Sequence, residues 1–154
     1  MNWFTNLMSN QFFIVGLSSW ALAQVLKTII HAAVYKKLEW ERLFGDGGMP
    51  SGHSATVVSV ATACAWFNGL GSFQFAISFI LAIIVCHDAT GVRLETGKQA
   101  FLIKEIASII EKIADQKVSD DVKLKEFVGH TVSQVICGAA LGIINALVFC
   151  GFVF

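Results

Sequence analysis

Residues 68–72, "NGLGS", lie between two apolar runs and decide the fold of the chain. The run before them is "SGHSATVVSVATACAWF" (51–67), and the run after them is "SFQFAISFILAIIVCHDAT" (72–90). Clusters of Gly, Asn and Ser between periodic segments are typical of turns. A helix needs about 20 apolar residues, range roughly 17–25, to cross the hydrocarbon core of a bilayer. The two runs are therefore predicted to form a helical hairpin of two membrane spans.

Two further apolar stretches, residues 12–35 and 129–154, are also long enough to cross a bilayer. The whole chain is 55% apolar and 14% charged, whereas a soluble domain is about 25% charged. Its mean hydropathy is +0.67. The first 11 residues lack Lys and Arg, so the first apolar run is interpreted as a retained span and not a signal peptide. We expect an all-α integral membrane bundle of about four transmembrane helices, forming a single membrane-embedded domain over residues 1–154.

The segment 101–117, "FLIKEIASIIEKIADQK", differs from these spans because apolar and charged residues alternate along it at helical spacing. Its apolar positions are Leu102, Ile106, Ile109 and Ile113, and polar residues lie between them. This pattern predicts an amphipathic helix on the cytoplasmic membrane surface. Residues 119–128 are predicted to follow as a charged helical segment, with Ser119 as its N-cap.

The charged residues predict the orientation of the chain. The 11 Lys and Arg balance 11 Asp and Glu, so no net charge attracts nucleic acid, and no nucleic-acid partner is expected. Every basic residue lies within 27–42 or 93–125, and two spans separate these stretches. The positive-inside rule therefore places both stretches in the cytoplasm and both termini outside. The four histidines, His31, His53, His87 and His130, also fall at the predicted cytoplasmic ends of the spans. We therefore expect the site at that face.

Residues 47–54, "GGMPSGHS", open the second span. Pro50 suits a first helical turn, and glycines let the backbone approach a ligand closely. The N–H groups of Gly52, His53 and Ser54 are predicted to point off the helix start, where the helix dipole favours an anion such as phosphate. His53 can there donate a proton to a leaving oxygen. The alternative is a plain helix start with a hydrated histidine.

Polar residues on the first and last spans add to this site. Lys27 shares one helix face with Gln24 and His31, although a lysine near a span end can instead snorkel to the surface. On the last span, Gln134 lies on a stripe with His130. Glycines at 138 and 142, within "GAALG", form a small-xxx-small pattern that predicts close packing of two helices. The two helices can belong to one chain, or to two copies that form a homodimer through this Gly138/Gly142 face.

The stretch 87–99, "HDATGVRLETGKQ", offers charged residues where the third span ends. Asp88 can orient a histidine or hold a divalent cation, and Arg93 can clamp two phosphate oxygens. The alternative is a solvated loop with salt bridges. The four cysteines lie in apolar stretches without CxxC spacing, so they are predicted core residues, and no metal site or required cofactor is expected.

Three segments together resemble the divergent branch of the PAP2 (type 2 phosphatidic acid phosphatase) superfamily, over roughly residues 20–150. They are "GGMPSGHSA" (47–55), "DATGVR" (88–93) and "GHTVSQVICGAALG" (129–142). The resemblance implies that Ser51 and Gly52 bind phosphate and that His53 acts as general acid. It also implies that His130 attacks phosphorus to form a phosphohistidine, a covalent intermediate that splits one hard step into two.

The chain departs from the superfamily pattern K-x6-R-P, P-S-G-H and S-R-x5-H-x3-D. It has no K-x6-R-P, and Lys27 and Arg42 are the nearest substitutes. The arginine of the third motif is replaced by Leu124, and its aspartate by Gln134. A glutamine can accept a hydrogen bond from imidazole but brings no charge to an imidazolium. Four spans also stand where the superfamily has six.

The sequence therefore predicts a membrane phosphatase that acts on a lipid or isoprenoid phosphate or diphosphate through phosphohistidine. His130 is the predicted nucleophile and His53 the acid. Lys27, Arg93, Ser51 and Gly52 are predicted to hold the phosphate, with Gln134 and Asp88 as orienting groups. The alternative is a non-catalytic membrane protein that binds anionic lipid headgroups or scaffolds partners, and a small transporter is a third interpretation.

Overall fold

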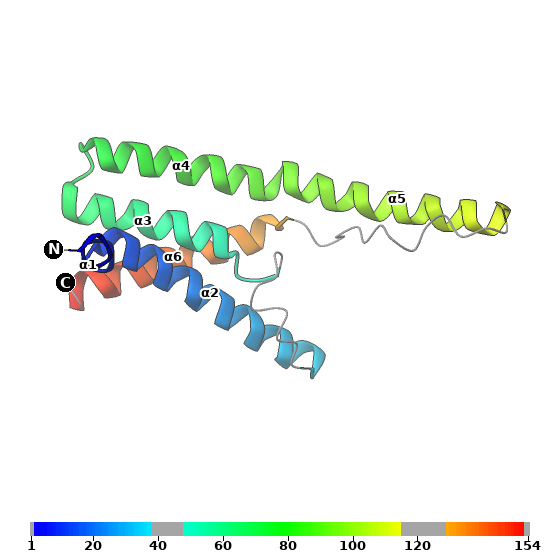
Figure 1. The fold of residues 1–154 in the computed structure, drawn as a ribbon, viewed down its shortest axis with the longest axis horizontal. Helices are drawn as coiled ribbons and strands as arrows, with labels where there is room; N and C mark the ends of the chain where they lie inside the picture. Colours follow the sequence, from blue (N-terminus) through cyan, green and yellow to red (C-terminus); the bar gives the residue numbers. More distant parts are fainter. Residues whose placement is uncertain (1, 38–47, 115–128, 153–154) are drawn as a thin grey trace.

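The computed structural model describes residues 2–37, 48–114 and 129–152, and these form helices without any strand. The helices are α1 (Trp3–Met8), α2 (Gln11–Tyr35), α3 (Gly52–Asn68), α4 (Phe73–Thr90), α5 (Val92–Ala114) and α6 (Val132–Phe152) (Figure 1). The predicted all-α class is confirmed. Arg42 and the predicted segment 119–128 with its cap Ser119 lie outside the described residues.

Helix α3 is the centre of the bundle and contacts α2, α4 and α6. Its buried side chains are small: Ser54, Ala55, Ser59, Ala61, Ala63 and Cys64. Many large apolar side chains of the surrounding helices are instead exposed, such as Phe79, Ile83 and Leu147. Small residues inside and large apolar residues outside are the arrangement expected of helices that pack in lipid.

The predicted hairpin of α3 and α4 is present. Helix α3 ends at Asn68, and Ser72 caps α4 by accepting a hydrogen bond from the Phe75 N–H at 3.1 Å. By length and composition, three helices can cross a membrane: α2, the nearly continuous α4–α5, and α6. Helix α3 has 17 residues, at the lower limit for a span, and its many Ser, Thr and Ala side chains make it less apolar. The fold is therefore a membrane bundle with three clear spans around a shorter central helix.

The close packing predicted from Gly138 and Gly142 occurs within the chain. A Cβ at Gly138 would overlap the carbonyl oxygen of Ser51, and a Cβ at Gly142 would overlap that of Ala55. Both glycines are buried against α3. A homodimer would need a surface other than this one, and pairing with a second copy stays an untested prediction.

Helix α5 begins earlier than the amphipathic pattern predicted. The helix already includes residues 92–99, for which a solvated loop with salt bridges was the alternative interpretation. The segment is helical and does carry a side-chain ion pair, of 2.6 Å between Glu95 and Lys98. The helix continues the direction of α4 and projects beyond the bundle (Figure 1). The expected apolar positions, Leu102, Ile106, Ile109 and Ile113, are on this projecting helix and are exposed. The sequence predicted the amphipathic character of α5 but not that α5 continues the direction of α4.

The two ends of the bundle differ in chemistry. Both termini and the α3–α4 turn lie at one end (Figure 1). The other end holds the last part of α2, the start of α3, the end of α4 and the start of α6. The four histidines and Lys27 lie in the segments at this second end, as the order of the four predicted spans indicated.

Candidate functional site

His53 and His130 meet at this end of the bundle, although 76 positions separate them in the sequence (130 minus 53, less one). Their ring centroids are 5.9 Å apart and the ring planes are inclined by 63°. His53 is in the first turn of α3 and half-buried, whereas His130 precedes α6 and is 2% exposed. A backbone hydrogen bond of 3.0 Å from Ser51 N–H to the Gln134 carbonyl joins the two helix starts. The two rings are therefore fixed by the α3–α6 contact.

The backbone around His130 is held from α4. Its N–H donates to the Ala89 carbonyl at 2.9 Å. The preceding Gly129 has φ +102 and packs against the backbone of Arg93 and Leu94, so that a Cβ there would overlap Leu94 N. Only glycine fits this position, both for its φ and for its space.

Gln134 determines the tautomer of His130. The Gln134 Oε1 atom accepts a hydrogen bond from Thr131 N–H at 3.2 Å and lies 3.2 Å from His130 Nδ1. A backbone N–H can only donate, which identifies this atom of the amide as oxygen. Nδ1 must therefore carry the proton that it shares with Gln134. In the neutral ring, Nε2 then keeps its lone pair, as a nucleophile requires.

The environment of His130 favours that neutral ring. Burial lowers the pKa of His130 below its ordinary value of 6.5, and the nearby positive charges of Lys27 and His53 lower the pKa further. The hydrogen bond to Gln134 and the Gly48 carbonyl oppose this by raising the pKa. Because desolvation is the largest of these effects, His130 is held mainly neutral near pH 7.

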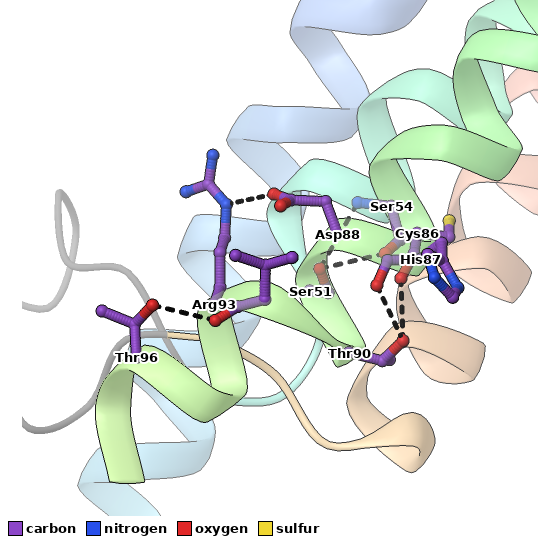
Figure 2. A network of polar contacts seen from close by, with 9 residues as sticks. Ser51, Ser54, Cys86, His87, Asp88, Thr90, Arg93 and Thr96 are labelled. Carbon is purple, nitrogen blue, oxygen red and sulfur yellow. Dashed lines mark hydrogen bonds and ion pairs between the residues drawn. The ribbon is translucent and has the colours of Figure 1, made fainter. Parts of the chain in front are cut away.

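The start of α3 is capped by its own side chains. Ser51 Oγ accepts hydrogen bonds from Ser54 N–H at 3.3 Å and from Ser54 Oγ at 3.1 Å, as Figure 2 shows. Both serines are fully buried. The Ser54 N–H is therefore engaged by the cap, which corrects the expectation that it faces a phosphate. The N–H groups of Gly52 and His53 are the other two that the sequence predicted to face an anion, and both belong to the first turn of α3.

Lys27 reaches the histidine pair from α2. It is 5% exposed, and its charge acts on His130. Its aliphatic stem runs over Gly48, where a Cβ would lie 3.3 Å from Lys27 Cγ. Gly48 also has φ +89, a conformation that favours glycine. The structure thus brings together Lys27, His53, His130 and the start of α3.

A cavity of about 200 Å³ opens beside Lys27. The sequence placed His31 at this end of the spans without giving it a role, and it did not single out Tyr35. Both residues line this cavity, and their rings lie 4.6 Å apart. The available signal was the helical spacing that puts Lys27 and His31 on one face of α2. The described residues that line the cavity are Lys27, Ile30, His31, Val34, Tyr35, Gly48 and Met49.

Arg93 and Asp88 occupy the α4–α5 joint and not the histidine pair. The Arg93 Nε atom lies 2.6 Å from Asp88 Oδ2, and the two side chains are 44% and 41% exposed (Figure 2). Asp88 thus orients Arg93, whereas Gln134 orients His130. Among the residues that the structure describes, no three His, Cys, Asp or Glu side chains gather as a metal site.

These features define a small helical membrane protein with a paired-histidine site at one end of its bundle. The chain belongs to the divergent PAP2 family, whose sequence profile matches residues 8–145. It is similar to the uncharacterized membrane protein YuiD of Bacillus subtilis (strain 168). The two are 36% identical over 154 aligned positions that cover 95% of this chain and 98% of that protein. No solved structure matches the chain.

Proposed function

We propose that the protein is a membrane phosphatase that hydrolyses a lipid or isoprenoid phosphate or diphosphate through a phosphohistidine on His130. One observation carries this proposal: two histidines face each other at 5.9 Å, and Gln134 holds one of them in the nucleophilic tautomer. Family membership supports the same class of chemistry.

The reaction has two steps. The Nε2 lone pair of His130 attacks phosphorus, the bond to the leaving oxygen breaks with its electron pair, and His53 gives that oxygen a proton. Water then attacks the phosphohistidine and loses a proton to His53, and the P–N bond breaks to restore the Nε2 lone pair. Gln134 keeps Nδ1 hydrogen-bonded throughout, so the ring keeps its orientation.

The phosphate is held by Lys27 and by the N–H groups of Gly52 and His53. Ser51 fixes these N–H groups by capping α3. Arg93 joins them after leaving Asp88, because an ion pair between such exposed side chains contributes only about 0.2–1 kcal/mol. A cation at Asp88 would compete with Arg93 for the same carboxylate, so the scheme assigns no step to a metal.

The site is proposed to face the cytoplasm, with both termini outside, because the basic residues that the structure describes, from Lys27 to Lys112, follow the helix ends on the side of the site. A substrate at the inner leaflet would then reach the histidines from the lipid. Membrane lipids surround the exposed apolar side chains.

The second candidate is a protein that binds anionic lipid headgroups without hydrolysing them. The uncharged Gln134 beside His130 favours it, because an amide stabilises a developing imidazolium less than a carboxylate does.

The test is phosphate release by the purified protein from a panel of lipid and isoprenoid phosphates. We expect turnover by the wild type and none by His130→Ala, since no covalent intermediate can form. The matched control is His87→Ala, which removes an exposed histidine from the end of α4 and should leave turnover unchanged. Labelled substrate should transfer an acid-labile phosphoryl group to the wild type only. Binding of these substrates by all three proteins without any phosphate release would establish the binding protein instead.

A further inference from the structure

The cavity beside Lys27 extends from the site along α2 to Tyr35, and the two-histidine reaction scheme gives this part of the protein no role. Lys27 acts on His130, and so does the Gly48 carbonyl, and both residues also line the cavity. The cavity and the histidine pair therefore share a wall. A phosphoryl group bound by Lys27 would lie at the boundary between them.

The chemistry of the cavity changes along α2. Lys27 is the buried cationic group at one end, His31 follows one helical turn later, and Tyr35 follows one turn after that. The rings of His31 and Tyr35 lie 4.6 Å apart and are inclined by only 31°, so each limits the orientation of the other. Imidazole N–H and phenol O–H are hydrogen-bond donors for an anionic oxygen. Ile30, Val34 and Met49 supply an apolar wall.

The volume of the cavity exceeds the needs of one phosphoryl group. A cavity needs about 10–15 Å³ on this measure to hold one water, so about 200 Å³ has room for several groups of that size. A single phosphoryl group, with one phosphorus and three terminal oxygens, leaves part of this space unfilled. A second phosphoryl group, joined to the first by a bridging oxygen, would extend from Lys27 toward His31.

We propose that this cavity is a second anion subsite in which His31 and Tyr35 bind the phosphoryl group next to the one under attack, so that the protein prefers a diphosphate to a monophosphate on the same hydrocarbon chain. The subsite rests on the proposed function, because it places the terminal phosphoryl at His130. After transfer of that phosphoryl, the leaving group is the monophosphate ester, which keeps its charge in the cavity.

The subsite is tested by measuring kcat/KM for two substrates that share one hydrocarbon chain and differ in the number of phosphoryl groups. The wild type should show a higher kcat/KM for dodecyl diphosphate than for dodecyl phosphate. His31→Ala should lower the kcat/KM for the diphosphate by about tenfold to a hundredfold, the usual effect of losing a hydrogen bond to a charged group. The value for the monophosphate should change by less than about twofold. His31→Gln keeps a donor and should restore part of the preference, whereas the control His87→Ala should change neither substrate. An equal fall for both substrates, or no fall, would overturn the subsite.

Binding separates this proposal from the proposed function. Calorimetry with dodecyl methylenediphosphonate and dodecylphosphonate, whose P–C bonds resist hydrolysis, should show tighter binding of the diphosphonate by the wild type and loss of that difference in His31→Ala. If phosphate release fails with every substrate but this binding preference holds, the subsite stands and the enzyme does not. If turnover occurs but the wild type binds both phosphonates equally, the enzyme stands and the subsite does not.

Discussion

At the scale of single residues, Gln134 orients His130 by a hydrogen bond, as a carboxylate would, but it supplies no negative charge to the ring. Its oxygen accepts from Thr131 N–H and from His130 Nδ1, which fixes the tautomer. It brings no negative charge, so burial lowers the pKa of His130 by more than the hydrogen bond to Gln134 raises it, and the nearby cations lower it further. The result is a histidine that stays neutral to a lower pH than usual.

This leads to a prediction about pH. The kcat/KM should rise as His130 loses its proton, and the acid limb of the profile should lie below 6.5, the ordinary histidine value. The same shift makes the folded state bind fewer protons than the unfolded state, so the stability that it contributes is lost as pH falls from 6.5 toward the folded pKa. Gln134→Asp should move the acid limb to higher pH, because a carboxylate favours the charged ring.

The control for this substitution is Gln99→Asp on exposed α5, which should leave the limb in place. A profile for Gln134→Asp that matches the wild type or moves to lower pH would show that Gln134 does not govern the protonation of His130.

A second residue-scale prediction concerns Gly48. Alanine there must adopt φ near +89, and its Cβ would press on the Lys27 stem at 3.3 Å. Gly69→Ala isolates the backbone effect, because Gly69 has φ +81 and no atom within 4 Å of an added Cβ. Both variants should lose about 1–3 kcal/mol of stability, because each places a Cβ on a backbone with positive φ. Only Gly48→Ala should also raise the KM for phosphate substrates; equal KM values for both variants would contradict a role for Lys27 in binding.

The sequence predicted which residues lie at the site better than it predicted which side chains those residues contact. His53, His130 and Lys27 converge as expected because each lies at the same end of its helix, and helix order alone fixes that. The Asp88–Arg93 pair and the positions of His31 and Tyr35 depend on side-chain directions and on the packing of the segment at Gly48 and Met49. Helical periodicity puts Lys27 and His31 on one face but does not show what faces them.

At the scale of elements, the fold depends on how closely α6 approaches α3. The contact occurs at the two glycines of α6, where backbone meets backbone without a side chain between. It also sets the distance between the two histidines, since the same contact carries the Ser51–Gln134 hydrogen bond. Small-xxx-small spacing predicted this approach, but it did not identify α3 as the partner.

The corresponding prediction is that Gly142→Ala destabilises the protein. Its Cβ would overlap the Ala55 carbonyl oxygen and lie 3.1 Å from Ser59 N, and backbone atoms cannot yield as a flexible side chain does. Overpacking of this kind costs about 1–3 kcal/mol. Denaturant unfolding in detergent should show this loss, whereas Gly151→Ala, with nothing within 4 Å, should unfold like the wild type. Equal stability of the two variants would mean that α6 is not seated against α3 at Gly142.

At the scale of the whole molecule, the arrangement of charge follows from the helix order. Both termini and the α3–α4 turn share one end of the bundle (Figure 1), and none of these segments contains Lys or Arg. The basic residues that the structure describes lie in the segments that start from the other end: Lys27, Lys36, Lys37, Arg93, Lys98, Lys104 and Lys112. The 38 residues from Phe73 to Ile110 form a helical stretch of about 57 Å at 1.5 Å per residue. This exceeds the about 30 Å of hydrocarbon, so α5 extends past the membrane core on the basic side.

Cysteine labelling of intact cells tests the resulting orientation. In a background with the four native cysteines replaced, single cysteines go in at Leu70, in the α3–α4 turn, and at Ile113, near the end of α5. These side chains are 72% and 82% exposed, so a membrane-impermeant maleimide can reach each of them from its own side. Because basic segments stay in the cytoplasm, the reagent should label position 70 from outside and label position 113 only after the membrane is opened. Labelling of position 113 in sealed cells would reverse the orientation and place the histidine pair on the outer face. The substrate would then have to come from the outer leaflet.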